Sequence, residues 1–264
     1  MYEFKKLHDG SKLLMLANAW DAGSARLFES LGAPAIATTS AGVAWAQGYA
    51  DGDYMPAEVA IGVAINIARV VKVPLSVDFE NGYSAEPEQV AHNVLRLIDA
   101  GVAGINLEDG GDAPALLAAK ISAIKKLAAQ AGKDIFINAR TDVYLRGLAP
   151  EGERVAEVLR RAALYKEAGT DGLFVPGISK ADEIKAVVAG AGLPVNVMDV
   201  AGLPLVAELQ QLGVARFSAG SGLAQALWAV AGGMTRDFLA TGNAGPLIAQ
   251  AMPYGELQAL FVKS

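Results

Sequence analysis

The sequence predicts an α/β protein with the architecture of a (β/α)8 barrel. Eight short apolar runs alternate with longer segments in which apolar residues recur at helical spacing. Several helical segments end in a glycine just before the next apolar run, which is typical of a left-handed helix C-cap. Strand, helix and glycine turn repeated in this order indicate parallel β/α units, and eight such units close most naturally into a barrel.

The predicted strands are spread along most of the chain. They cover residues 13–17, 35–39, 75–79, 104–107, 135–139, 172–175, 195–198 and 216–218. Between them lie segments whose apolar residues recur at helical spacing, for example Val90, Val94 and Leu97. The glycines at the helix ends are Gly32, Gly101, Gly169 and Gly213. An open doubly wound sheet is the alternative, but no Gly-x-Gly-x-x-Gly follows the first strand to support a dinucleotide fold.

The chain after the eighth strand is expected to form additional helices. An apolar stretch covers residues 223–230, and the tail continues to residue 264. The length of 264 residues fits a single α/β barrel, which takes about 200–250 residues. We therefore expect one barrel domain over residues 1–264, with a C-terminal helical segment at 223–264.

Composition excludes several classes of partner and chemistry. The chain has 22 Lys plus Arg against 28 Asp plus Glu, a formal charge of −6, and no basic stripe, so we expect no nucleic-acid partner. The uncharged stretches 31–50 and 217–235 are interrupted by glycine and polar residues, so we expect no membrane partner. The absence of Cys excludes thiol nucleophiles, thiolate metal sites and a thiol acid. With no disulfide framework and no secretory pattern in residues 1–16, a cytoplasmic enzyme is expected.

Acidic side chains end the third and fourth predicted strands, where a barrel of this kind builds its active site. Side chains two apart on a strand point to the same side, so Asp78 should project with Glu80, and Asn106 with Glu108. Unpaired, the three converging carboxylates would repel one another, and their burial would be costly. A divalent cation resolves this, and oxygen ligands without nearby His or Cys favour Mg²⁺, with Mn²⁺ as the alternative.

A basic side chain ends the fifth predicted strand. Arg140 should project with Asn138, opposite the metal, where its guanidinium would offer a bidentate fork to a substrate carboxylate or phosphate. The alternative is that these charged residues form a structural ion-pair network at the barrel mouth. The remaining acidic residues at strand ends are expected to cap helices or to pair with Arg: Asp109, Asp142 and Asp199.

Two kinds of catalytic group are not predicted. No Lys stands at a strand end, which argues against a Schiff-base aldolase. His8 and His92 fall in the N-terminal segment and in a helix, where we expect solvated or capping roles.

Five segments together resemble the isocitrate lyase / phosphoenolpyruvate mutase superfamily. They are NAWDAGSARL from Asn18, TTSAGVAWAQGYADGD from Thr38, VDFENGY from Val77, GINLEDG from Gly104 and INARTDVYL from Ile137. The resemblance runs in register from about Asn18 to Ser218. It implies a (β/α)8 barrel that exchanges its last helix between partners in a homo-oligomer, a dimer or a tetramer. It also implies that Mg²⁺ binds an α-oxo acid and stabilises a pyruvate-like enolate.

By this resemblance, Asp78 matches the direct metal ligand of the family. Glu80, Glu108 and an aspartate after the second strand would act through waters. The segment GYAD points to Asp51 as that aspartate, with the adjacent Asp53 as the alternative.

The resemblance also assigns substrate-binding residues. Thr39, Ser40 and Gly42 fall where the family holds the substrate carboxylate. Arg140 matches the substrate-binding arginine, and Asn196 matches an asparagine of the seventh strand. The residues expected to carry the catalysis are Asp51, Glu108 and Arg140.

The departures from the family pattern limit the activity. Isocitrate and methylisocitrate lyases carry Lys-Lys-Cys-Gly-His after the fourth strand, with the Cys as the acid that protonates the product. Here that loop begins GGDAP at Gly110 and has neither Cys nor His, so these two activities are not expected. The longer polar gating loop of the mutase and phosphonopyruvate hydrolase members is also absent or truncated. The third strand reads Asp-Phe-Glu where the family more often has Asp-x-Asp.

Three functions follow in order of preference. The first is a Mg²⁺-dependent lyase that cleaves a carbon–carbon bond next to an α-oxo carboxylate, with oxaloacetate decarboxylation as the simplest case, because decarboxylation needs no strong base to start. The second is a phosphorus–carbon bond mutase or hydrolase of the phosphonopyruvate type. The third is a barrel that binds α-oxo acids without turnover, because the shortened loop leaves no evident gate or proton donor.

Overall fold

The computed structural model describes residues 2–262, and parallel strands form its centre. Within these described residues, the sheet has nine strands in the order β1-β9-β8-β7-β6-β5-β4-β3-β2. β1 (Leu14–Leu16) pairs with β9 (Arg216–Ser218), and β2 (Asn18–Ala19) pairs with β3 (Ile36–Thr38). Only Ala17 separates β1 from β2, so the two are halves of one barrel strand, and the predicted (β/α)8 barrel is confirmed.

The other strands begin and end close to the predicted positions. They are β4 (Leu75–Asp78), β5 (Gly104–Glu108), β6 (Phe136–Arg140), β7 (Gly172–Phe174) and β8 (Val195–Met198). β5 and β6 each extend one residue beyond the predicted end. That extension places Glu108 directly beside Arg140 in the parallel register.

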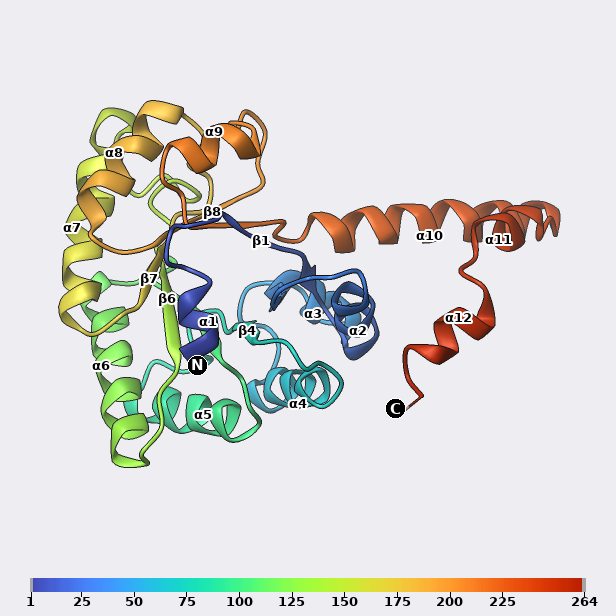
Figure 1. The fold of residues 1–264 in the computed structure, drawn as a ribbon, viewed down its shortest axis with the longest axis horizontal. Coiled ribbons are helices and arrows are strands. Elements are labelled where there is room, and N and C mark those ends of the chain that lie inside the picture. The colour runs from blue at the N-terminus through green and yellow to red at the C-terminus, as the bar shows by residue number, and fades with distance from the viewer. Residues whose placement is uncertain (1, 263–264) are drawn as a thin grey trace.

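Helices cover the outside of the barrel, as Figure 1 shows. They are α2 (Ala22–Ser30), α4 (Ala57–Ala68), α5 (Pro87–Asp99), α6 (Pro114–Gln130), α7 (Arg154–Glu167), α8 (Ala181–Ala191) and α9 (Val206–Gln211). The short α3 (Ser40–Ala46) follows β3, and the 3₁₀ turn η1 (Glu151–Glu153) precedes α7. The four glycines predicted at helix ends all have φ between 82° and 101°, which confirms the left-handed turns that lead into the strands.

The N-terminal helix α1 (Tyr2–Lys6) and the turn after it pack against the start of β6. Phe4 packs edge-on against His8 and against Phe136, and the His8 ring stacks on Phe136. His8 is therefore buried rather than solvated, whereas its Nδ1 lies 2.9 Å from the Phe4 carbonyl of α1, which is the expected capping contact. Burial, with a smaller effect of Arg216, lowers the pKa of His8 to about 4. His92 is exposed, as expected.

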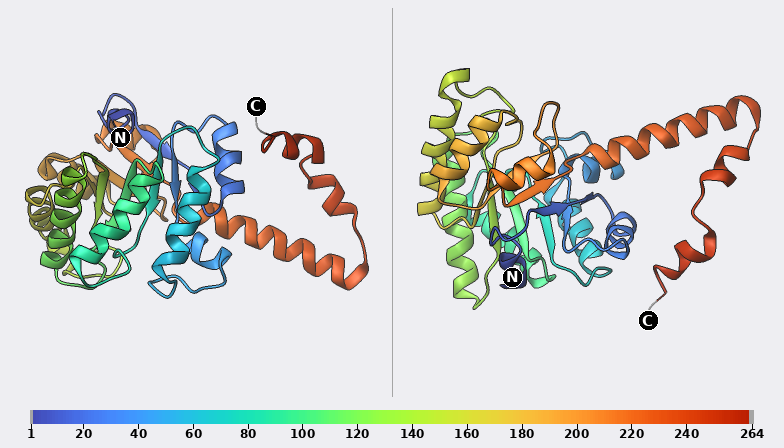
Figure 2. Two further views of the ribbon diagram at one scale, coloured as in Figure 1. Left: turned by 90° about the horizontal axis from the view of Figure 1, so that it is seen from below. Right: turned by 45° about the horizontal axis from the view of Figure 1, so that its top comes forward.

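The C-terminal segment extends away from the barrel. α10 (Gly222–Thr241) projects outward, and α11 (Gly245–Gln250) and α12 (Tyr254–Ala259) turn back, as Figures 1 and 2 show. Arg26 Nε on α2 donates a hydrogen bond to the Leu260 carbonyl at 2.8 Å. Large apolar side chains along this arm are exposed, among them Leu227, Trp228, Val230, Phe238, Leu239 and Ile248. Within residues 2–262, no helix combines the length and the apolar character needed to span a bilayer.

Candidate active site at the carboxyl ends of the strands

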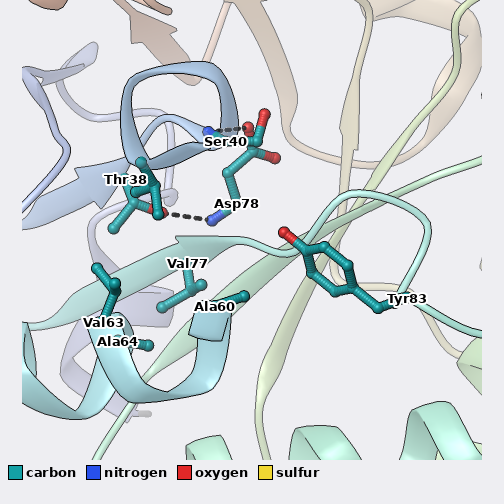
Figure 3. Close-up of a pocket in the computed structure, with 9 residues that line it drawn as sticks. Thr38, Ser40, Ala60, Val63, Ala64, Val77, Asp78 and Tyr83 are labelled. Atoms are coloured by element: carbon teal, nitrogen blue, oxygen red, sulfur yellow. Dashed lines mark hydrogen bonds between the residues drawn. The ribbon is translucent and has the colours of Figure 1, made fainter. Parts of the chain in front are cut away.

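The candidate site is centred on Asp78, the last residue of β4. Its backbone N–H donates to Thr38 Oγ1 at 2.8 Å, and its Oδ2 accepts from the Ser40 N–H at 3.1 Å, as Figure 3 shows. Its Oδ1 accepts from Asn106 Nδ2 at 3.3 Å. A cavity of about 10 Å³ lies beside these groups, close to the least volume that holds one water. The first residue of α3 and a side chain of β5 therefore fix the two oxygens of this carboxylate.

Glu80 lies in the loop after β4 and is 3% exposed. Its Oε1 accepts from the Tyr83 hydroxyl at 2.8 Å, and its Oε2 accepts from the Asp53 N–H at 2.6 Å. Burial raises the pKa of Glu80 to about 7, although both hydrogen bonds oppose the shift. Asp53, Glu80 and Tyr83 are also the non-glycine residues with positive φ among residues 2–262, at 64°, 47° and 57°. Backbone strain is thus concentrated in this hydrogen-bonded group, as is common at functional sites.

Glu108 and Arg140 form an ion pair at the ends of β5 and β6. Arg140 Nη1 lies 2.7 Å from Glu108 Oε2. On its other edge, Arg140 donates to Asp142 from Nε at 2.7 Å and from Nη2 at 3.0 Å. Burial raises the pKa of Glu108 to about 8, Arg140 opposes this shift, and Asp78 adds to it. The guanidinium is therefore held between two carboxylates at the barrel mouth.

A second layer of buried groups supports this ion pair. Asp109 accepts from the Asp142 N–H at 2.9 Å, from Arg161 Nη1 at 2.8 Å and from the Tyr165 hydroxyl at 2.6 Å. Asp109 and Asp142 thus pair with arginines, as expected. Asp199 is exposed, and its N–H donates to the Ser218 carbonyl.

Asp51 belongs to the same electrostatic group. Burial and repulsion by Asp78 raise its pKa, while Arg140 opposes the shift and the Ser40 hydroxyl donates to it. The side chain of Asp53 instead accepts from Asn81. Of the two aspartates left open by the sequence, Asp51 is therefore the one whose charge interacts with both Asp78 and Arg140.

The remaining predicted substrate-binding residues lie in two places, around the start of α3 beside Asp78 and inside the barrel. Thr39 precedes α3, and Ser40 begins it. A Cβ at Gly42 would come within 2.7 Å of Thr39 Cγ2 and 3.0 Å of Trp20 Cβ, so glycine is also needed there for packing. Asn196 is 1% exposed and hydrogen-bonded inside the barrel.

The donor set can be compared with the needs of a divalent cation. No three His, Cys, Asp or Glu side chains within residues 2–262 are already close enough to hold one ion. The available donors are carboxylate oxygens, and mutual repulsion adds to the raised pKa values of Asp51, Glu80 and Glu108. These residues fit a hard cation with few direct protein ligands and the others reached through water.

Two residues near the site were missed from the sequence. Tyr83 lines the Asp78 cavity (Figure 3), and its hydroxyl donates a hydrogen bond to Glu80. Lys120 on α6 is 2% exposed, and its Nζ donates to the Asn81 carbonyl at 2.7 Å in the same loop. The signal for Tyr83 was its position three residues after Glu80. The sequence contains no comparable signal for Lys120.

Comparison with known proteins shows which family, relatives and solved structures the chain as a whole is similar to. The family model for phosphoenolpyruvate phosphomutase matches residues 4–239. An uncharacterised protein of Mycobacterium tuberculosis is 38% identical over 264 residues, which cover 98% of this chain and 96% of that protein. An oxaloacetate decarboxylase of Pseudomonas entomophila is 27% identical over 206 residues, 76% of this chain and 70% of that enzyme. A crystal structure from Burkholderia cenocepacia, of a protein provisionally classed as a phosphonomutase, is 43% identical with a TM-score of 0.81, covering 87% of this chain and 96% of that one.

Proposed function

The chain belongs to the phosphoenolpyruvate phosphomutase family, and we propose that it is an oxo-acid lyase that cleaves a carbon–carbon bond next to an α-oxo carboxylate. Oxaloacetate decarboxylation is the simplest such reaction. The observation that carries the proposal is the clamped Arg140 beside the carboxylates of Asp51, Asp78 and Glu108 at the barrel mouth. The similarity to an oxaloacetate decarboxylase over most of the chain supports it.

The proposal includes a divalent cation, Mg²⁺ or Mn²⁺. Asp78 would be its direct ligand, and Glu80, Glu108 and Asp51 would hold its waters. Bound there, the ion would supply Lewis-acid stabilisation of the negative charge that develops on the keto oxygen. The carboxylates that repel one another in the protein alone would then have a common counter-charge.

The residues of the chain would bind and orient the substrate. The terminal nitrogens of the planar Arg140 fork, Nη1 and Nη2, would pair with a substrate carboxylate through two parallel N–H donors once Nη1 is released from Glu108. Asp142 fixes the plane of that fork, because it accepts from Nε and Nη2 together. Thr39, Ser40 and Gly42 would contact the second carboxylate, at the start of α3 beside Asp78. The chain needs no strong base for this reaction, because loss of CO₂ itself generates the electron pair of the enolate.

Isocitrate and methylisocitrate cleavage are not part of the proposal. The family's proton donor for those reactions is a Cys in the loop after β5, and this chain has no Cys. The loop is also short, because only five residues separate the end of β5 at Glu108 from the start of α6 at Pro114.

One experiment tests the proposed function directly. The protein is incubated with Mg²⁺ and a panel of three- to six-carbon oxo acids, and pyruvate and CO₂ release are measured. Asp78→Ala is expected to abolish both turnover and Mn²⁺ binding, because it removes the direct ligand. Full turnover by Asp78→Ala would refute the metal assignment. Oxalate or pyruvate binding without product from any acid would favour the non-catalytic barrel.

A phosphorus–carbon bond enzyme is the second candidate. It is favoured by the 43% identity to the Burkholderia protein provisionally classed as a phosphonomutase. Phosphorus NMR of an incubation with phosphonopyruvate separates the two activities, because only this candidate changes the phosphorus signal.

We also propose that the protein is a homo-oligomer, because the arm formed by α10, α11 and α12 exposes large apolar side chains. An exposed apolar face of this kind is typical of a subunit interface. The arm of one subunit would pack on the barrel of its partner.

A further inference from the structure

Three asparagine side chains form a hydrogen-bonded chain inside the barrel. Asn106 on β5, Asn138 on β6 and Asn196 on β8 are 5%, 2% and 1% exposed. Asn138 Nδ2 donates to Asn106 Oδ1 at 3.0 Å and to Asn196 Oδ1 at 3.1 Å. One amide group therefore bridges two others, and we call Asn196, Asn138 and Asn106 the amide chain.

The direction of the amide chain is fixed at the Asn196 end. Asn196 Nδ2 donates to the Val197 carbonyl at 2.6 Å and to the Arg216 carbonyl at 3.3 Å. Carbonyl oxygens only accept, so an inverted Asn196 would place its own oxygen against them. The Asn196 oxygen must therefore face Asn138, and the Asn138 NH₂ group must donate a hydrogen bond to it.

The same logic fixes the Asn106 end. Asn106 Oδ1 accepts from Asn138 Nδ2, and Arg216 Nη2 lies within hydrogen-bond distance of it at 3.4 Å. Both of these groups are donors, so the Asn106 NH₂ is turned the other way, toward Asp78 Oδ1 at 3.3 Å. An inverted Asn106 would set its oxygen against the Asp78 carboxylate and its NH₂ against two donors.

The surrounding barrel leaves room for the amide chain. β7 begins with Gly172, where a Cβ would come within 2.9 Å of Asn138 Oδ1. Any side chain at that position would displace the bridging amide. The buried Arg216 contacts the Asn106 oxygen through Nη2, at 3.4 Å. Its Nε and Nη1 have no hydrogen-bond partner in the part of the chain described.

We propose that Asn138 is a positioning residue, which acts through Asn106 to fix the orientation of the Asp78 carboxylate for the metal ion. The inference rests on the proposed function, because it takes Asp78 as the direct metal ligand. It gives Asn196 the role of anchoring the amide chain, without contact with the substrate. Partners of this kind behind a metal ligand typically change metal affinity or activity 10–100-fold when replaced, an order-of-magnitude range.

The test compares two variants of Asn138 with a matched control. Asn138→Asp replaces the bridging NH₂ with an oxygen that faces two acceptors, and Asn138→Ala removes the bridge without adding charge. The control is Asn93→Asp on α5, which makes the same change at a residue 4% exposed whose Oδ1 accepts from Gln89. Mn²⁺ affinity is measured by electron paramagnetic resonance of the free ion, alongside kcat, KM and the thermal midpoint.

We expect both Asn138 variants to weaken Mn²⁺ binding about tenfold or more and to lower kcat, with Asn93→Asp within about twofold of the wild type. Stability loss alone would affect Asn93→Asp as well, so the affinity separates positioning from a structural role. Unchanged Mn²⁺ affinity in either folded Asn138 variant, with normal binding by the wild type, overturns this inference and leaves the proposed function standing. A wild type that binds no Mn²⁺ overturns both.

Discussion

Replacing Asp142 with Asn should loosen the Arg140 clamp and destabilise the protein. The Asp142 side chain is fully buried and accepts from Arg140 at 2.7 and 3.0 Å and from Arg146 at 3.1 Å. Asn keeps one acceptor but turns an NH₂ toward a guanidinium N–H, so at least one charge-assisted hydrogen bond of about 1.5–3 kcal/mol is lost. The buried guanidinium also loses one of its two carboxylate partners, and breaking such a pair costs about 3–5 kcal/mol. We expect the free energy of unfolding to fall by about 3 kcal/mol.

The assay is a double-mutant cycle read by urea unfolding. Asp142→Asn, Arg140→Met and the double variant are compared with the wild type, and the coupling energy between the two positions should be about 2 kcal/mol. The KM for the oxo acid should rise in Asp142→Asn more than kcat falls, because the fork is misaligned for binding. If the losses of unfolding free energy from the two substitutions add within about 0.5 kcal/mol, Asp142 does not hold the Arg140 guanidinium.

Three further predictions concern other parts of the molecule. Arg140→Ala should chiefly raise KM for the oxo acid, by about tenfold or more, since it removes a substrate anchor worth more than about 1.4 kcal/mol; an unchanged KM in steady-state kinetics would count against that role. His8, whose pKa falls to about 4 on folding, binds its proton more readily in the unfolded chain, so its contribution to stability is complete above pH ~6.5 and is lost as the pH falls through ~4. By urea unfolding, the free energy of unfolding of the wild type should be about 2 kcal/mol lower at pH ~5 than above pH ~6.5, and His8→Phe should lose correspondingly less. Parallel pH profiles of the two proteins would contradict the low pKa of buried His8. Truncation after Ser221 removes the apolar arm and should reduce the proposed oligomer to smaller species in light scattering after size-exclusion chromatography, whereas an unchanged mass would argue against the arm as the interface.

The barrel was predictable because its signals are local and repeated. Apolar runs of strand length recur in every unit and left-handed glycines at the ends of helices recur in most, so the number and order of strands followed from the sequence. The break at Ala17 did not, because the predicted apolar run ends at Ala17 and gives no sign that the next two residues, Asn18–Ala19, pair with a different neighbour. His8 was misjudged for a related reason, since its burial depends on Phe136, which lies far away in sequence.

The candidate site was partly predictable for a different reason. Because the carboxyl ends of parallel strands meet at one rim of the barrel, Asp78 and Glu108 were expected there, and the register shows that Glu108 stands beside Arg140. Pairing of Asp142 with an arginine was expected, but its two hydrogen bonds to Arg140 depend on the turn after β6, which the period-two pattern of a strand does not describe. The direction of the amide chain depends on hydrogen-bond partners from three strands, and no single segment of the sequence contains that information.

The glutamate at position 80 is best understood together with the two residues that contact it. The family more often has a shorter aspartate there, whereas Glu80 reaches both the Tyr83 hydroxyl and the Asp53 N–H, at 2.8 and 2.6 Å. An aspartate on the same backbone would end about 1.5 Å short and could not accept from both donors, since one methylene is missing. All three residues adopt left-handed backbone conformations that cost about 1–3 kcal/mol each, so the surrounding contacts must hold them in place. The longer carboxylate, the tyrosine and the Asp53 loop therefore form one unit, in which the length of Glu80 connects the loop between α3 and α4 to the loop after β4 at the edge of the site.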